Sequence, residues 1–261
     1  MKLQKLQIAH DARPQARTLL LATLLTFALW FIPYASVLAY PFRLFVTFIH
    51  EGGHALAAVL TGNTVKSLSV SIDTSGLTET YLTNGGLFSQ LFVSSAGYLG
   101  AMLFGALLLF LVRRTVAARV VLLGSGFFIL ALTLVYGLIV PLSYFTLSPF
   151  TVVMGLLISV GLIAAAKYFS PRAANFLVGL LAVQCVLNAL FDLKTLLFLS
   201  VASDAQTDAM NMARITGIPA LIWAIIWIGI GFLILSAALR VYAVKKNPRQ
   251  PDLPFEDSFT V

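Results

Sequence analysis

Charged side chains are scarce in this sequence. Only 10% of its 261 residues are Asp, Glu, Lys or Arg, whereas 59% are hydrophobic, and the mean hydropathy is +0.95. A soluble globular domain carries about 25% charged residues. The composition therefore excludes an ordinary soluble domain and predicts a polytopic membrane protein, most of whose chain crosses the bilayer.

Cysteine is almost absent as well. The single Cys185 excludes an internal disulfide and a cysteine-based zinc site, and it lies in an apolar run where packing is its expected role. Acidic residues are fewer than basic ones, which gives a net charge of +7. Because the basic residues are spread over connections and termini, this surplus indicates contact with an anionic lipid bilayer, and we see no nucleic-acid-binding pattern.

Long apolar runs make up most of the chain, and each is close to the roughly 20 residues that a helix needs to cross a bilayer. They cover residues 18–38, 41–61, 87–112, 120–140, 147–166, 173–199 and 218–241. We therefore expect an all-α polytopic membrane protein with about seven transmembrane helices, forming one domain over residues 18–241. Residues 1–17 form a basic N-terminal segment, and residues 242–261 form a polar tail that we expect to be disordered.

One connection has a different pattern. Residues 65–73 alternate between polar and apolar side chains, which predicts a β-strand. Residues 74–76 are turn-forming, and residues 77–83 predict a second short strand. A β-hairpin over about 64–83 should therefore join the second and third spans. Two interpretations stay open: an ordinary surface hairpin, or an open strand edge that holds an extended peptide by strand addition.

Two of the three histidines lie in the second apolar run, in the sequence His50-Glu51-Gly52-Gly53-His54. On a helix, positions i and i+4 share a face, so His50 and His54 can bind one metal ion. Neutral imidazoles suit zinc, and Glu51 is close enough to act as general base on a water at the metal. This spacing is typical of zinc metalloproteases. Chance occurrence is disfavoured, because a His–Glu pair inside a lipid-embedded helix is costly unless it has a function.

A catalytic zinc site needs about three protein ligands. Among the ten acidic residues, only Glu51 and Asp192 lie within apolar runs, whereas Asp204 and Asp208 fall in a polar connection that we expect to be a loop. Elimination therefore selects Asp192 as the third ligand. Asn188 lies one turn earlier on the same helix face, where it could orient that carboxylate or hold a substrate backbone. The alternative is that Asp192 pairs with a nearby lysine or caps a broken helix.

These motifs together resemble the site-2 protease family of intramembrane zinc metalloproteases, and most closely its compact, bacterial M50B-like branch. Members carry a similar His-Glu-x-Gly-His-Ala-Leu run, here His50–Leu56, and a similar Ala-Gly-Tyr-Leu-Gly run, here Ala96–Gly100. A distant intramembrane Asp preceded by Asn completes the resemblance, which covers about residues 18–200. The later motif departs from the family pattern, because no proline follows Asn188 and no glycine follows Asp192.

The resemblance implies a multi-pass protein of the bacterial cytoplasmic membrane that hydrolyses peptide bonds of membrane-embedded protein substrates. It implies Zn²⁺ held by His50, His54 and Asp192, with Glu51 as the general base and Asn188 as a substrate contact. The substrate would be a transmembrane segment of another membrane protein. This segment must unwind locally before cleavage, because its carbonyl groups are engaged in helical hydrogen bonds.

Two other functions stay open. A transporter or channel could use the same intramembrane His, Glu and Asp side chains to line a metal or proton path. Against it, the sequence shows no internal repeat of the kind that many transporters carry. The other alternative is a non-catalytic relative that binds membrane partners through the same fold, and the intact Glu51 argues against it.

Two considerations predict opposite orientations in the membrane. The family pattern puts the N-terminus in the cytoplasm and runs the second span from outside to inside. With seven spans, this pattern leaves the basic residues near Arg113, Lys167 and Lys245 outside, whereas the positive-inside rule prefers them inside. The sequence alone leaves both orientations open.

Overall fold

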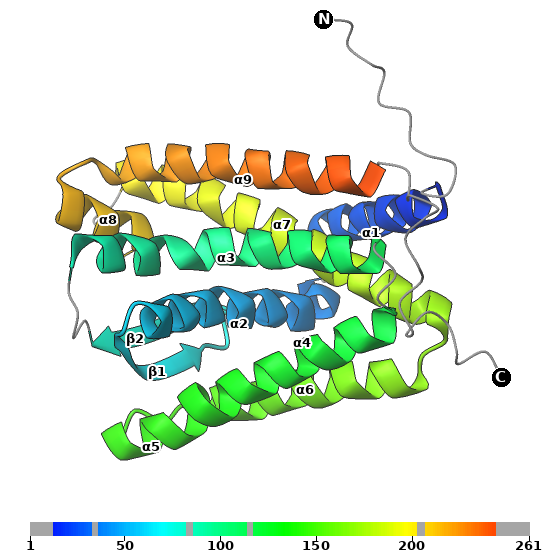
Figure 1. The fold of residues 1–261 in the computed structure, drawn as a ribbon, viewed down its shortest axis with the longest axis horizontal. Coiled ribbons are helices and arrows are strands. Elements are labelled where there is room, and N and C mark those ends of the chain that lie inside the picture. The colour runs from blue at the N-terminus through cyan, green and yellow to red at the C-terminus, as the bar shows by residue number, and fades with distance from the viewer. Residues whose placement is uncertain (1–12, 33–35, 82–85, 114–116, 203–206, 244–261) are drawn as a thin grey trace, which may run out of the picture.

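The computed structural model describes residues 13–32, 36–81, 86–113, 117–202 and 207–243, which form a bundle of helices with a β-hairpin at one end (Figure 1). The elements in chain order are α1 (Arg13–Phe31), α2 (Ser36–Leu60), β1 (Thr64–Val70), β2 (Gly76–Tyr81), α3 (Leu87–Arg113), α4 (Ala118–Leu132), η2 (Thr133–Ile139), α5 (Val140–Tyr144), α6 (Pro149–Tyr168), α7 (Pro171–Ala202), α8 (Asp208–Thr216) and α9 (Ala220–Ala243). The C-terminal tail and most of the basic N-terminal segment lie outside the described residues, although α1 already begins within that segment.

Five helical stretches of the described chain are long and apolar enough to cross a membrane, so the predicted count of seven is not confirmed. They are Leu87–Leu111, Ala118–Tyr144, Pro149–Tyr168, Pro171–Phe198 and Ala220–Arg240. In α1 the apolar stretch covers only Leu19–Leu29, which is too short to span the bilayer. Helix α2 is long enough, but two histidines, Arg43 and Glu51 reduce its apolar character.

Two prolines act differently from the sequence prediction. The second apolar run was expected to begin at Pro41, but α2 begins at Ser36 and contains this proline in its interior. The fourth was expected to end before Pro141, but the helix continues through the π-helical segment η2 and α5 as far as Tyr144. Pro141 follows directly on the π-helical segment, and a local π-helical change is one way in which a helix accommodates the hydrogen bond that a proline cannot make.

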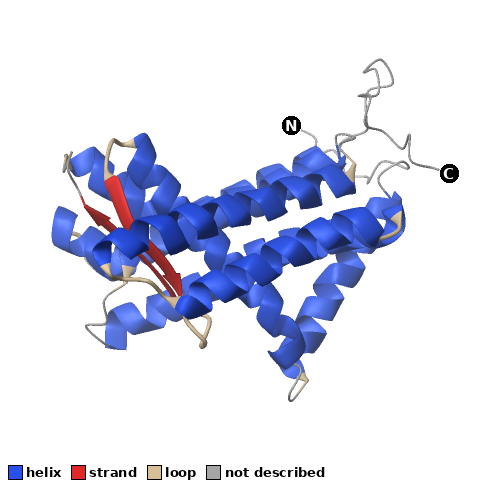
Figure 2. Ribbon diagram, turned by 90° about the horizontal axis from the view of Figure 1, so that it is seen from below, coloured by secondary structure: helices blue, strands red, loops and turns tan. Residues whose placement is uncertain are grey.

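The predicted β-hairpin is confirmed. Strands β1 and β2 pair antiparallel, and an irregularity in the register falls between Val65 and Ser67. Figure 2 shows both strands, in red, at one end of the helical bundle. The backbone N–H of Val70 donates to Oγ1 of Thr151 over 2.8 Å, and the Thr151 hydroxyl donates back to the Val70 carbonyl over 3.1 Å. These two bonds fix the end of β1 to α6.

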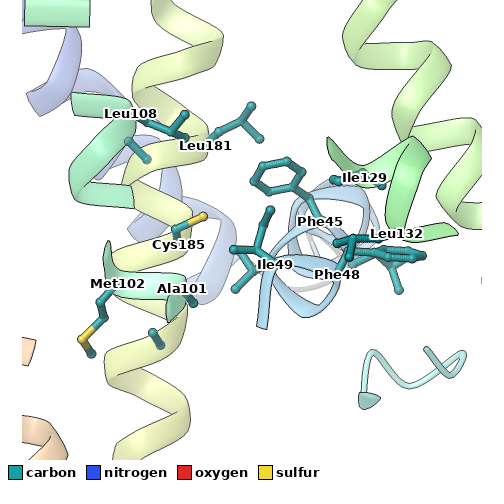
Figure 3. Packing of buried hydrophobic residues seen from close by; sticks show 14 of the residues in the cluster. Phe45, Phe48, Ile49, Ala101, Met102, Leu108, Ile129, Leu132, Leu181 and Cys185 are labelled. Carbon is teal, nitrogen blue, oxygen red and sulfur yellow. The ribbon is translucent and has the colours of Figure 1, made fainter. Parts of the chain in front are cut away.

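Helix α2 lies at the centre of the bundle. Figure 3 shows its side chains Phe45, Phe48 and Ile49 between residues of α3 and α7 on one side and of α4 on the other. Phe45 and Phe48 are almost completely buried. Because close-packed interiors resist displacement, the polar residues one turn further along α2 are held on a rigid element.

Candidate metal centre

The two histidines of α2 point toward one another. Their Nε2 atoms are 3.1 Å apart. The other ring nitrogen of His54, Nδ1, lies 2.7 Å from the backbone carbonyl oxygen of Val93 in α3. Since a carbonyl can only accept a hydrogen bond, Nδ1 carries a proton, and in the neutral ring Nε2 of His54 is then the nitrogen whose lone pair can bind a metal. This is the arrangement that orients a metal-binding histidine.

The third member of the group is Asp208, at the start of α8. Its Oδ2 lies 3.4 Å from Nε2 of His50 and 3.3 Å from Nε2 of His54. The three ligand atoms lie within 4.8 Å of one another, and these residues form the one such His/Cys/Asp/Glu group found in the part of the chain that the structure describes. Burial raises the pKa of the Asp208 carboxyl, but attraction to the imidazoles of His54 and His50 and hydrogen bonds from them lower it by a larger amount. The net shift of the pKa is therefore downward and favours the carboxylate.

The spacing of these atoms fits a zinc ion. Donor atoms in a tetrahedral zinc site lie about 3.3 Å apart, given metal–ligand bonds of about 2.0–2.1 Å. The three separations measured between His50, His54 and Asp208 are 3.1, 3.4 and 3.3 Å. Two imidazoles and one carboxylate are also the donor set of many catalytic zinc sites, which leave the fourth position open.

Sequence reasoning set Asp208 aside as a loop residue, and that premise is wrong. Thr207 caps α8, because its side chain accepts a hydrogen bond from the Met210 N–H over 3.2 Å. Gly217 ends the helix in a left-handed conformation, with φ at 74°. A threonine cap, a terminal glycine and Pro219 just beyond it are readable signals of a short helix, so the helix could have been found from the sequence.

The structure does not bring Asp192 into this group. Asp192 lies on α7 and lines the same cleft as the two histidines, but its carboxylate is not one of the three groups within 4.8 Å of each other. Its assignment as a ligand stays a prediction without a test. The geometry favours Asp208, which reaches the histidines because α8 folds back beside α3 and α9 (Figure 1).

Glu51 is buried beside the histidines and faces the hairpin. The hydroxyl of Thr78 in β2 donates to Oε2 of Glu51 over 2.7 Å and is 3.1 Å from the Glu51 carbonyl oxygen. A Cβ on Gly76 would overlap the Glu51 carboxylate, so this glycine lets the strand pass close to it. Strand β2 thus fixes the carboxylate in the wall of the cleft.

Helices α2 and α3 approach closely where the histidines lie. A Cβ on Gly53 would overlap the backbone carbonyl of Ala96, and one on Gly100 would lie 3.5 Å from the Cα atom of Gly53. A Cβ on Gly97 would overlap Nε2 of both histidines. The run Ala96–Gly100 is therefore small-residue packing of the kind that lets membrane helices meet, and it also leaves room for the two imidazoles.

Replacing Gly97 with alanine is expected to lower metal binding without unfolding the protein. The added methyl group would displace the tips of both imidazoles, whereas the helix itself tolerates alanine better than glycine. Metal content by mass spectrometry and helix content by circular dichroism measure the two effects. Gly124→Ala is the matched control, since a Cβ there meets nothing within 4 Å. Equal metal content in the two variants would contradict the proposed packing.

A cleft of about 1120 Å³ opens in front of these residues. Residues of α2, the hairpin, α3, α7 and α8 line it, including all six residues of β2. Successive residues of a strand point to opposite faces, so a strand whose every residue lines the cleft presents its edge to it. Since β1 occupies one edge of β2, the cleft lies along the other.

A chain of hydrogen bonds leads from the bundle interior to Asn188 at the cleft. The Thr26 hydroxyl donates to the Ala22 carbonyl over 2.9 Å and so can only accept from Nε2 of Gln184, 3.3 Å away. Gln184 must then turn Oε1 to Asn188, whose Nδ2 donates to it over 2.9 Å. This direction leaves Oδ1 of Asn188, a residue that lines the cleft, as a hydrogen-bond acceptor.

Comparison with protein families gives one match. A family model described as Peptidase M50B-like matches residues 20–238. The chain belongs to the Peptidase M50B-like family. This match confirms the predicted resemblance to site-2 proteases. The family and the five apolar helices together indicate a peptidase that crosses the membrane several times. Comparisons with curated proteins and with solved structures give no match.

Proposed function

We propose that the protein is an intramembrane zinc metalloprotease that hydrolyses peptide bonds of membrane-embedded protein substrates. The observation that carries this proposal is the cluster of His50, His54 and Asp208, with Glu51 beside it, at the edge of one cleft. The two histidines and Asp208 are the proposed zinc ligands. Family membership supports the same activity.

His50, His54 and Asp208 would hold the zinc ion, which would supply a water of pKa about 7 and polarise a carbonyl group. Glu51 is placed to take a proton from that water on one carboxylate oxygen and to pass it to the leaving amine. The Thr78 hydroxyl holds Oε2 of Glu51 in place. Val93 holds the ring of His54 through its carbonyl oxygen.

The substrate is proposed to bind as an extended segment along the open edge of β2. Adding a strand there would hold it by main-chain hydrogen bonds, which suits sequences of many kinds. Thr78 of the same strand contacts Glu51, so the bound segment would pass directly in front of the general base. Oδ1 of Asn188 is proposed to accept a hydrogen bond from a backbone N–H of the same segment.

Replacing Gln184 with leucine is expected to lower kcat/KM for a fluorogenic single-span peptide about fivefold, because about 1 kcal/mol of hydrogen bonding would no longer orient Asn188. Metal content should not change. In an Asn188→Ala background the same replacement should have no further effect, since the two residues act as one unit. Additive losses in the double variant would contradict the orienting role of Gln184.

The alternative function is a transporter that uses the same residues for metal ions or protons. A relay would need titratable groups distributed across the membrane, whereas His50, His54 and Asp208 form a single compact group. Replacing Glu51 with glutamine separates the two functions. A protease variant should keep its zinc and lose peptide-bond cleavage, while a transporter variant should lose or change ion flux.

A further inference from the structure

Most of the described helices begin and end at one of two ends of the bundle (Figure 1). We call one the hairpin end; it holds the β-hairpin, the α5–α6 connection and α8. We call the other the basic end; it holds the start of α1, the end of α3, the start of α4, the α6–α7 connection and the end of α9. At the basic end, Nη2 of Arg119 in α4 donates to the Phe169 carbonyl after α6 over 2.8 Å, which joins the start of α4 to the end of α6.

Charge is distributed unequally between the two ends. The helix termini at the basic end carry seven basic residues: Arg13, Arg17, Arg113, Arg119, Lys167, Arg172 and Arg240. No acidic residue of the described ranges lies among them. The rest of the described chain holds four basic residues, Arg43, Lys66, Lys194 and Arg214, against five acidic ones, Glu51, Asp73, Glu79, Asp192 and Asp208. The surplus of positive charge therefore lies at one end only.

The directions of α1 and α2 remove the conflict over orientation. Both helices run toward the hairpin end (Figure 1), and Thr26 of α1 bonds Gln184 of α7, which runs the same way. The link from Phe31 to Ser36 can extend at most about 18 Å, less than the roughly 30 Å hydrocarbon thickness. The chain cannot cross back within it, so α1 and α2 count as one crossing. The start of α1 and the end of α9 then lie at the same end.

We infer that the basic end faces the cytoplasm and that the cleft opens toward the opposite, extracytoplasmic side of the membrane. Short loops rich in Lys and Arg stay in the cytoplasm, where anionic lipids attract each basic residue near the surface with about 1 kcal/mol. With α1 and α2 as one crossing, the basic residues at the start of α1 and those at the other helix termini of the basic end all predict the same orientation in the membrane. Helix α2 then runs from inside to outside, opposite to the family pattern stated above.

This orientation defines a class of substrate, and this step rests on the proposed function. The cleft is lined by all six residues of β2 and by Asp208 of α8, and both elements belong to the hairpin end. Substrates would therefore be membrane proteins whose helix can unwind in the extracytoplasmic half of the bilayer. Water for hydrolysis would enter from the same side.

Labelling of single cysteines tests the orientation. Cys185 is the only cysteine and is buried, so Cys185→Ala provides a background without reactive thiols. Ser71→Cys in the hairpin and Ser170→Cys in the α6–α7 connection introduce exposed thiols at the two ends. With a membrane-impermeant maleimide, we expect Ser71→Cys to react in right-side-out vesicles and Ser170→Cys to react only in inverted vesicles.

The reverse labelling pattern, or equal labelling of either cysteine from both sides, would overturn the inference. Alkaline phosphatase fused after Val261 gives a second measurement that needs no substitution. The fused phosphatase should be inactive, because α9 ends at the cytoplasmic side in the inferred orientation. An active phosphatase would contradict this orientation. Neither experiment depends on zinc or on proteolysis. A failed orientation can therefore be told apart from a failed function.

Discussion

Replacing Asp208 with alanine is expected to remove the bound zinc from the purified protein. The reason is that Oδ2 of Asp208 lies within 3.4 Å of both imidazole nitrogens, so its loss removes one of three ligands. Loss of an outer hydrogen-bond partner weakens metal binding about 10–100-fold, and loss of a ligand should weaken it more. Metal content by mass spectrometry and a competition titration with a zinc chelator measure the change.

Asp192→Ala is the matched control for this experiment, because Asp192 is the other aspartate of the helices that line the cleft. We expect this variant to keep one zinc ion per chain. Asp208→Asn preserves side-chain size, and circular dichroism of this variant checks that zinc loss is not caused by unfolding of α8. Zinc retained in Asp208→Ala and lost in Asp192→Ala would reinstate the assignment made from the sequence.

The contrast between Asp192 and Asp208 shows what sequence reasoning can reach. His50, Glu51 and His54 could be grouped because helical periodicity fixes their geometry over a single turn. The third carboxylate comes from a helix more than 150 residues later, and nothing local specifies which distant element packs against α2. Elimination by hydrophobicity selected Asp192 because it lies in an apolar run, whereas Asp208 enters the site from a short polar helix at the end of the bundle.

The hairpin and the helix count also show that local patterns can be predicted from the sequence, whereas the packing of distant elements cannot. Alternation over residues 65–73 predicted β1 correctly, because the period of two is a local property of the chain. The direction of α1 relative to α2 is not local, so the sequence could not show that both helices run toward the same end of the bundle. Likewise, the Ala96–Gly100 run could be recognised as close packing, but only the structure identifies Gly97 as the residue that makes room for the imidazoles.

Replacing Glu51 with glutamine is expected to lower kcat by about 10²–10⁴-fold, the range that a positioned general acid–base contributes, while one zinc ion stays bound. Glutamine has nearly the same shape, and its amide oxygen can still accept the hydrogen bond from Thr78 that is seen at 2.7 Å. It cannot take a proton at neutral pH. Cleavage of a fluorogenic single-span peptide in detergent micelles, beside metal content, measures both effects.

Thr78→Val is the companion variant, because it removes the hydroxyl that holds Glu51 but keeps the carboxylate. Its activity should fall between those of the wild type and Glu51→Gln, with zinc unchanged. Cleavage by Glu51→Gln at the wild-type rate would show that Glu51 is not the general base. Zinc or proton flux in proteoliposomes that depends on Glu51, without any peptide-bond hydrolysis by the wild type, would favour the transporter instead. The two readouts separate the functions because only hydrolysis needs a proton to move from water to a leaving amine at a single site.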